Sequence, residues 1–281
     1  MTVKVITDST SDIGPELAEA LNITVVPIYV RFGDQVYWDG IDITSDEFYE
    51  RLTVSPVHPA TSLPTPGDFA GVYSEYVNRS DGIVSIHISS KLSGTCGSAL
   101  LAKKMVGGAC PIEVVDSKFN SVGTGLVVIA AARLAQSGES LSEVVAEAYK
   151  AIEQVHMFGM FETMKYLARS GRVDKTIAAA AGILKVMPLL TFKNGEIVRA
   201  GLVRTIAKGM DRIYDFVKNR VPVRELSIVH SAIPDQANQL RKRLGVLFPE
   251  DNIPIVKLGA GLGVHGGPGV LVLALRRLAT D

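Results

Sequence analysis

Apolar residues in the first half of the chain form short β-branched runs that alternate with amphipathic stretches. This alternation is typical of βαβ units built on a mainly parallel sheet. An extended run at residues 23–30 contains Pro27, which predicts an edge or a bulge rather than a central strand. The pattern predicts strands at 3–6, 83–88 and 112–115, and helices at 13–21, 94–105, 122–135 and 140–155.

The pattern changes beyond about residue 155. Residues 187–192 and 197–203 flank Asn194-Gly195, which predicts a β-hairpin because Asn-Gly supplies the positive φ angles of a type I′ turn. Further helices are expected at 206–218 and 235–244, and further strands at 226–229, 253–257 and 270–275. The predicted fold class is therefore α/β, with a mainly parallel sheet in an N-terminal domain of residues 1–154 and an α+β domain of residues 155–281.

Two segments do not follow either pattern. Residues 60–66 contain Pro64 and Pro66, and we expect an extended loop there. Residues 177–184 are a nearly uncharged run of small residues, which predicts either a close-packed helix or one wall of an apolar channel.

Composition narrows the class of protein. The 281 residues are 47% hydrophobic and 21% charged, which predicts a packed globular core, and 29 basic against 29 acidic residues give a net charge of zero. We therefore expect no nucleic-acid partner. Two cysteines without metal-ligand spacing predict neither a disulfide framework nor a zinc site. The opening residues lack a signal-peptide pattern and no apolar window is long enough to span a bilayer, so a cytoplasmic location is expected.

Three predicted strand-to-helix turns, at residues 7–12, 89–95 and 116–121, are rich in Ser, Thr and Asp. In a parallel sheet such turns lie at the carboxyl ends of the strands, where open α/β folds bind ligands. The start of the helix after Ser93 also offers free backbone N–H groups to a carboxylate or phosphate. The alternative is that these residues are ordinary helix N-caps.

The sequence matches known catalytic and nucleotide-binding motifs poorly. Gly259, Gly261 and Gly263 do not form a dinucleotide fingerprint, and no GxxxxGK[ST] loop occurs. His265 lies among glycines in residues 264–269, which predicts a loop that presents the imidazole to a ligand. Ser93, His265 and Asp8 or Asp116 supply the residue types of a serine hydrolase, but Ser93 lacks the GxSxG elbow.

Seven motifs in order along nearly the whole chain resemble the DegV family of bacterial fatty-acid-binding proteins. They are TDSTSD at 7–12, ATSLPTP at 60–66, ISSKLSGT at 88–95, DSKFNSVG at 116–123, YLARSGR at 166–172, VRT at 203–205 and HGGPG at 265–269.

The resemblance implies a two-domain protein that holds one long-chain fatty acid between its domains and presents the carboxylate to a fatty acid kinase. The kinase then forms an acyl phosphate with ATP for phospholipid metabolism, so the carrier is not itself an enzyme and needs no cofactor. The ligand-binding residues that it implies are Thr61, Ser62, Ser93, Gly94 and His265, with Arg172 and Arg204 near the carboxylate mouth. Departures from the family pattern at Leu63, Cys96, Gly97, Leu202 and Val272 affect the expected tail preference.

Two other classes of function remain open from the residues alone. One is a serine hydrolase acting through Ser93, and the other is a binder of phosphorylated ligands that uses the same anion-ready turns. Burial of a sixteen-carbon tail at about 0.8 kcal/mol per methylene gives on the order of 12 kcal/mol before costs, so a carrier needs few polar contacts.

Overall fold

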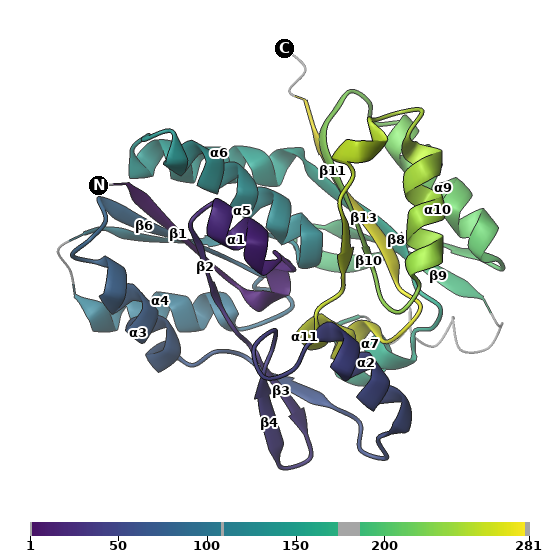
Figure 1. The fold of residues 1–281 in the computed structure, drawn as a ribbon, viewed down its shortest axis with the longest axis horizontal. Helices are drawn as coiled ribbons and strands as arrows, with labels where there is room; N and C mark the ends of the chain where they lie inside the picture. Colours follow the sequence, from purple (N-terminus) through teal and green to yellow (C-terminus); the bar gives the residue numbers. More distant parts are fainter. Residues whose placement is uncertain (1, 108–109, 174–185, 279–281) are drawn as a thin grey trace.

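A computed structural model describes residues 2–107, 110–173 and 186–278 (Figure 1). Its first sheet has four parallel strands in the order β2-β1-β6-β7. The predicted parallel sheet in the N-terminal part is confirmed, and Pro27 ends β2 at the sheet edge, as its sequence position indicated. The strands are β1 Val3–Asp8, β2 Ile23–Val26, β6 Gly82–His87 and β7 Ile112–Asp116.

The second sheet has six strands in the order β10-β9-β8-β13-β11-β12, antiparallel except for the β11–β12 pair. The predicted hairpin is confirmed, with positive φ angles at Asn194 and Gly195 in its turn. The strands are β8 Val155–Met160, β9 Met187–Lys193, β10 Glu196–Val203, β11 Val223–His230, β12 Ile255–Lys257 and β13 Leu271–Arg277.

A third, three-stranded antiparallel sheet was not predicted from the sequence. It has the order β4-β3-β5, formed by β3 Tyr29–Phe32, β4 Gln35–Trp38 and β5 Ala60–Ser62. The prediction that residues 60–66 form only a loop is therefore wrong for the first three of them, because they pair with β3. Pro66 instead opens α3, where its missing N–H costs nothing.

Helices separate the two large sheets and cover their outer faces (Figure 1). Helices α3 and α4 cover one face of the parallel sheet, α5 contacts strands of both sheets, and α9 and α10 cover the far face of the six-stranded sheet. The helices are α1 Pro15–Ala20, α2 Ser45–Val54, α3 Pro66–Tyr76, α4 Thr95–Val106, α5 Ser121–Gln136, α6 Leu141–Gln154, α7 Lys165–Ser170, α9 Ile206–Lys218, α10 Pro234–Leu244 and α11 Ala260–Gly266, with 3-10 turns η1 Ser9–Ser11 and η2 Glu250–Asn252.

The largest apolar cluster joins the two halves of the chain. It includes Val5 and Val84 from the parallel sheet, Val127 from α5, and Met157 and Val272 from the second sheet. The division at residue 154 stays a prediction. Within the described ranges no helix has the length and apolar character needed to cross a bilayer.

Candidate functional site

A cavity of about 620 Å³ lies between the turns of the parallel sheet and one face of the six-stranded sheet. Six of the seven predicted site residues line it: Thr61, Ser62, Ser93, Gly94, Arg172 and His265. The seventh, Arg204, does not line the cavity, and its exposed side chain lies between β10 and α9. The run at residues 177–184, interpreted as a channel wall or a packed helix, lies outside the described residues.

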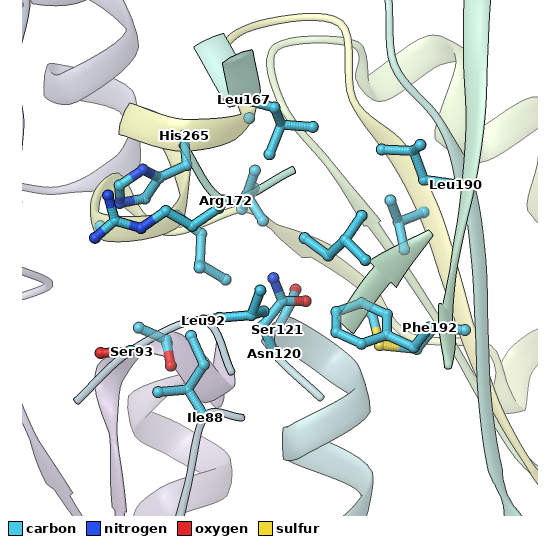
Figure 2. Close-up of a pocket in the computed structure, with 18 of the residues that line it drawn as sticks. Ile88, Leu92, Ser93, Asn120, Ser121, Leu167, Arg172, Leu190, Phe192 and His265 are labelled. Carbon is cyan, nitrogen blue, oxygen red and sulfur yellow. The ribbon is translucent and has the colours of Figure 1, made fainter. Parts of the chain in front are cut away.

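The predicted convergence of the three polar turns is confirmed, because each supplies residues to this cavity. Thr10 follows β1, Ser90 and Ser93 follow β6, and Asn120 and Ser121 follow β7. Figure 2 shows Ser93, Arg172 and His265 together at one end of the cavity and Leu190 and Phe192 at the other. The cavity therefore has one polar end and one apolar end.

Helix α4 begins at the polar end. Its N-cap is Gly94, which has no side chain to accept a hydrogen bond from the first turn. The Ser93 hydroxyl lies 2.9 Å from the Thr95 hydroxyl and accepts only a long hydrogen bond, 3.4 Å, from the Thr95 N–H. The N-terminus of α4, with the positive end of its helix dipole, thus begins at the cavity wall beside Ser93 and Gly94, and such a helix start suits an anion.

His265 is bonded to Thr61 across the same end of the cavity. Its Nε2 atom lies 2.8 Å from Thr61 Oγ1, whereas Nδ1 is buried without a hydrogen-bond partner in the described part of the chain. Burial, followed by the charges of Arg172 and His58, lowers the pKa of His265 to about 4, so the ring is neutral at pH 7. With the hydrogen on Nε2, the ring donates to Thr61 and leaves the Thr61 hydroxyl free to donate to an anion.

His265 does not lie in a loop, as the sequence indicated, but in the last turn of α11. The alternating glycines explain this difference, because each admits a neighbour at close range. A Cβ atom at Gly259 would lie 2.8 Å from Asp12 Oδ1, one at Gly261 would lie 2.3 Å from Ile28, and one at Gly263 would lie 2.6 Å from Phe48. The glycine run is thus a helix that packs closely against the N-terminal half, rather than a nucleotide loop.

Arg172 supplies a positive charge to the polar end. It follows Gly171, which ends α7 in the left-handed conformation with φ of 69°. Its guanidinium donates to the Ser170 carbonyl at 2.5 Å, forms no ion pair among the described residues, and lies beside His265 in Figure 2. An exposed arginine at a cavity mouth can meet carboxylate or phosphate oxygens with paired hydrogen bonds.

The apolar end was not identified from the sequence. Its wall is the inner face of the second sheet, where Met157 of β8, Phe192 of β9 and Val272 of β13 face the cavity at alternate strand positions. Phe192 also packs on Phe119, with ring centroids 5.5 Å apart. No strand was predicted from the sequence at β8, and the opposite face of the sheet is equally apolar because α9 and α10 cover it.

The turn of the β9–β10 hairpin contacts the polar turns. The Ser89 hydroxyl donates to the Gly195 carbonyl at 2.7 Å, and a Cβ atom at Gly195 would lie 2.7 Å from that hydroxyl. This contact fixes the hairpin against the parallel sheet beside the cavity.

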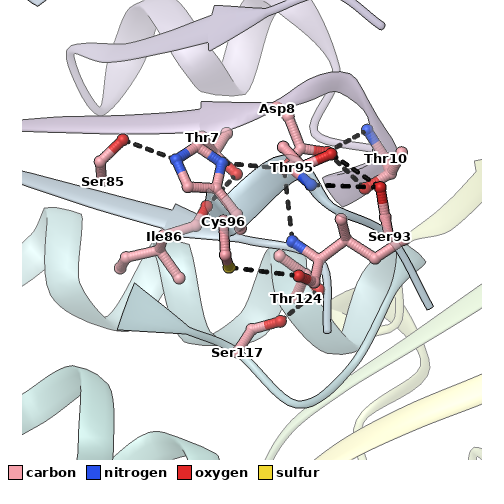
Figure 3. A network of polar contacts seen from close by, with 12 residues as sticks. Thr7, Asp8, Thr10, Ser85, Ile86, Ser93, Thr95, Cys96, Ser117 and Thr124 are labelled. Carbon is pink, nitrogen blue, oxygen red and sulfur yellow. Dashed lines mark hydrogen bonds and ion pairs between the residues drawn. The ribbon is translucent and has the colours of Figure 1, made fainter. Parts of the chain in front are cut away.

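A serine-histidine-aspartate chain does occur, but in the core. Ser85 Oγ lies 2.6 Å from His87 Nε2, and His87 Nδ1 lies 2.9 Å from Asp8 Oδ2 (Figure 3). All three residues are fully buried and none lines the cavity. Tyr73 donates to Ser85, and Asp8 accepts from the Thr10 N–H and hydroxyl, so the network holds the β1 turn in place.

The alternative triad through Ser93 is not assembled. The Ser93 hydroxyl is paired with Thr95, whereas His265 is paired with Thr61 and has no carboxylate on Nδ1 among the described residues. A nucleophilic serine needs a base within hydrogen-bond reach and a group that orients the base. Nor does any cluster of His, Cys, Asp and Glu in the described ranges suit a metal ion.

Comparisons with known proteins agree with this geometry. Residues 2–277 match the family model described as "Uncharacterised protein, DegV family". A DegV domain-containing protein of Deinococcus radiodurans is 32% identical over 99% of this chain and 100% of that protein.

Two solved structures are similar over almost their whole length. One, from Thermus thermophilus, is described as showing fatty acid binding by a DegV family protein; it has a TM-score of 0.90 and 32% identity, and the match covers 99% of this chain and 100% of that one. The other is a stearic acid-binding protein of Eubacterium ventriosum, with a TM-score of 0.89, 28% identity and 98% of both chains covered.

Proposed function

This chain belongs to the DegV family, and on that basis we propose that it binds one long-chain fatty acid in the cavity and presents the carboxylate to a fatty acid kinase for acyl phosphate formation. The fatty-acid-binding relatives from Thermus thermophilus and Eubacterium ventriosum support the choice of ligand. The observation that carries the proposal is the division of one cavity into an anion-ready end and an apolar end.

In this proposal the carboxylate binds at the polar end, at the start of α4. There the Ser93 hydroxyl and the Gly94 turn supply donors, and Thr61 and Ser62 face them from β5. His265 is neutral, so it contributes no positive charge and instead orients Thr61. The carboxylate is thus held mainly by neutral donors, with Arg172 as the nearest cation at the mouth.

The apolar end supplies most of the affinity. Each buried methylene contributes about 0.8 kcal/mol, so a tail of sixteen carbons gains on the order of 12 kcal/mol before ordering costs. Met157, Phe192 and Val272 offer contact without any charge. A phosphorylated sugar or nucleotide would leave this wall uncovered, which favours the fatty acid over that rival.

The kinase is proposed as a separate partner because this chain has no GxxxxGK[ST] phosphate loop. In this proposal the chain is a carrier that acts in the cytoplasm without a cofactor of its own, and it supplies the acyl group for phospholipid metabolism. Residues 1–154 form the head-group domain and residues 155–281 the domain that closes the tunnel. Arg172 then donates hydrogen bonds to the acyl phosphate as it forms at the mouth of the cavity, and Arg204 lies on the neighbouring surface.

Organic extraction and mass spectrometry of protein purified from a bacterial host test the proposal. We expect close to one long-chain fatty acid per chain, and an unrelated protein purified in parallel gives the background of adventitious lipid. Absence of a stoichiometric acyl species would overturn the proposal. A rise in melting temperature with phosphorylated ligands, but not with fatty acids, would favour the phosphate-binding alternative.

A further inference from the structure

Two carboxylates, Asp12 and Asp39, lie behind the cavity wall rather than in it. Asp39 is 5% exposed and accepts a hydrogen bond of 2.8 Å from the Ser9 hydroxyl. Asp12 accepts from the Ser121 hydroxyl and, at 2.9 Å, from the Gly259 N–H. Neither residue is used by the proposed contacts with a fatty acid.

Both carboxylates hold the start of α11. The backbone N–H groups of Ala260 and Gly261 face Asp39 closely enough to favour its charged form, and the preceding N–H, of Gly259, donates to Asp12 at 2.9 Å. These are N–H groups that a helix cannot satisfy internally. The other side of α11 lines the cavity through Leu262 and His265.

The packing leaves α11 little freedom at this point. A Cβ atom at Gly261 would lie 2.8 Å from Asp39 Oδ2, and one at Gly259 would lie 2.8 Å from Asp12 Oδ1. The helix has only seven residues, and its last turn carries His265. A shift at its first turn therefore moves the imidazole away from Thr61.

We propose that Asp39, assisted by Asp12, is a positioning residue of the lipid site: its carboxylate fixes the first turn of α11 so that His265 reaches Thr61 and orients the hydroxyl that receives the ligand carboxylate. The consequence for the ligand rests on the proposed function, whereas the position of His265 does not.

The charged groups around Asp12 and Asp39 are mainly acidic. Burial raises the pKa of Asp39 to about 6 and that of Asp12 to about 7; hydrogen bonds to each oppose this rise, and the charge of Asp8 adds to it. Burial, followed by the charges of Asp12 and Asp39, raises the pKa of Tyr49. A second cavity is lined by both carboxylates together with Glu19 and Lys257.

NMR titration of His265 tests the proposal directly. The protein is labelled with ¹³C at the histidine Cε1 atoms, and His265→Gln identifies the signal. In the unmodified protein the ring should stay neutral down to pH 5 because its pKa is about 4. In Asp39→Ala the released ring is solvated, and its pKa should rise by at least one unit toward the ordinary value of about 6.5.

Asp39→Asn keeps an acceptor oxygen and should lie between the two, which makes it the conservative rescue. Asp46→Asn is the matched control, because Asp46 is an exposed carboxylate that pairs with Lys257 on the surface. Its titration should match that of the unmodified protein. A merely structural role would lower the melting temperature of Asp39→Ala without moving the His265 titration, and that result would overturn the proposal.

Fatty acid release gives the second measurement. Transfer of bound fatty acid to acceptor vesicles should be about tenfold faster from Asp39→Ala, equivalent to a loss of about 1.4 kcal/mol. If Asp39→Ala does not fold, Asp39→Asn decides both measurements, and an unchanged titration and release rate in that variant overturn the proposal. An unmodified protein without bound fatty acid would overturn the proposed function alone, because the titration of His265 is still measurable.

Discussion

The two ends of the cavity are built in different ways from different parts of the chain. Short turns after β1, β6 and β7 form the polar end, and each holds its own side chains through local hydrogen bonds such as that of Asp8 with the Thr10 N–H. The apolar end is the face of an antiparallel sheet whose residues come from β8, β9 and β13, far apart in sequence. The three polar turns are thus fixed locally, and Thr61, Arg172 and His265 join them through long-range contacts. The apolar wall has no such local part and exists only after long-range pairing.

This difference separates specificity from affinity. Hydrogen bonds to a charged group contribute about 1.5–3 kcal/mol each and depend on atomic position. Apolar contact is non-directional and grows with buried area. Substitutions at the apolar end should therefore change affinity for every ligand, whereas those at the polar end should distinguish an acid from its ester.

The largest effect is expected from a charge in the apolar wall. Phe192→Asp places a carboxylate among Met157, Phe119 and Leu190, where it has no partner. Binding of fatty acids and their methyl esters should weaken together by about 100-fold or more.

Isothermal titration with both ligands measures this loss. Lys193→Asp, at the exposed next position of β9, is the control and should bind both ligands normally. Retained binding in Phe192→Asp would place the tail elsewhere.

The second effect concerns pH and the polar end. Because the pKa of His265 is about 4 in the folded protein and about 6.5 when unfolded, the unfolded state binds more protons between these values. His265 therefore contributes stability above pH 6.5 that is lost as the pH falls toward 4, up to about 3 kcal/mol.

Urea unfolding at pH 7.5 and pH 4.5 checks this, with His265→Gln as the comparison. The variant should lose less stability on acidification than the unmodified protein does. The raised pKa values of Asp12 and Asp39 act in the opposite direction, but they are common to both proteins and cancel in the difference. Equal acid losses would contradict the buried, neutral ring.

A third effect should separate acid from ester. In the proposed site Ser93 donates to the ligand carboxylate, so Ser93→Ala should weaken binding of free fatty acid by about 1–3 kcal/mol. The methyl ester should bind almost unchanged. Parallel titrations with the two ligands provide the measurement, and equal losses for both would show that Ser93 does not contact the carboxylate.

The smallest effect on binding is expected from the arginines. Arg172→Ala and Arg204→Ala should both purify with bound lipid, since the tail supplies most of the affinity. Both should nevertheless fail in a coupled assay with a fatty acid kinase and ATP, with the larger defect in Arg172→Ala because only Arg172 lines the cavity. Full acyl phosphate production by both would assign these arginines to ordinary surface charge.

The sequence allowed prediction of the three polar turns because their signals are local, whereas Thr61 and Arg172 were assigned to the site by resemblance. Strand periodicity, the Ser- and Gly-rich turns and Asn194-Gly195 all lie within a few residues of what they specify. The same reasoning missed β3, β4 and β5, since these short strands depend on pairing with each other and residues 60–66 carry two prolines. It also missed α11, whose glycines are poor helix formers and are explained only by Asp12, Ile28 and Phe48 packed against them.

Local sequence signals did not identify the apolar wall of the cavity for another reason. Both faces of β8 are apolar, with Phe158 toward α9 and Met157 toward the cavity. The alternation of side chains along the strand therefore does not indicate which face borders the cavity. Arg204 was placed with Arg172 by resemblance, and only the structure separates the two.

The docked turn of the β9–β10 hairpin has a consequence for engineering the chain. Hairpin tips with small polar residues are ordinarily the safest places to insert a tag or open a chain for circular permutation. Here Gly195 lies against the Ser89 hydroxyl, so an insertion would pull the second sheet away from the polar turns. The β3–β4 tip at Gly33 and Asp34 is exposed and has no such neighbour at Gly33, and it is the place for a fluorescent reporter or new termini.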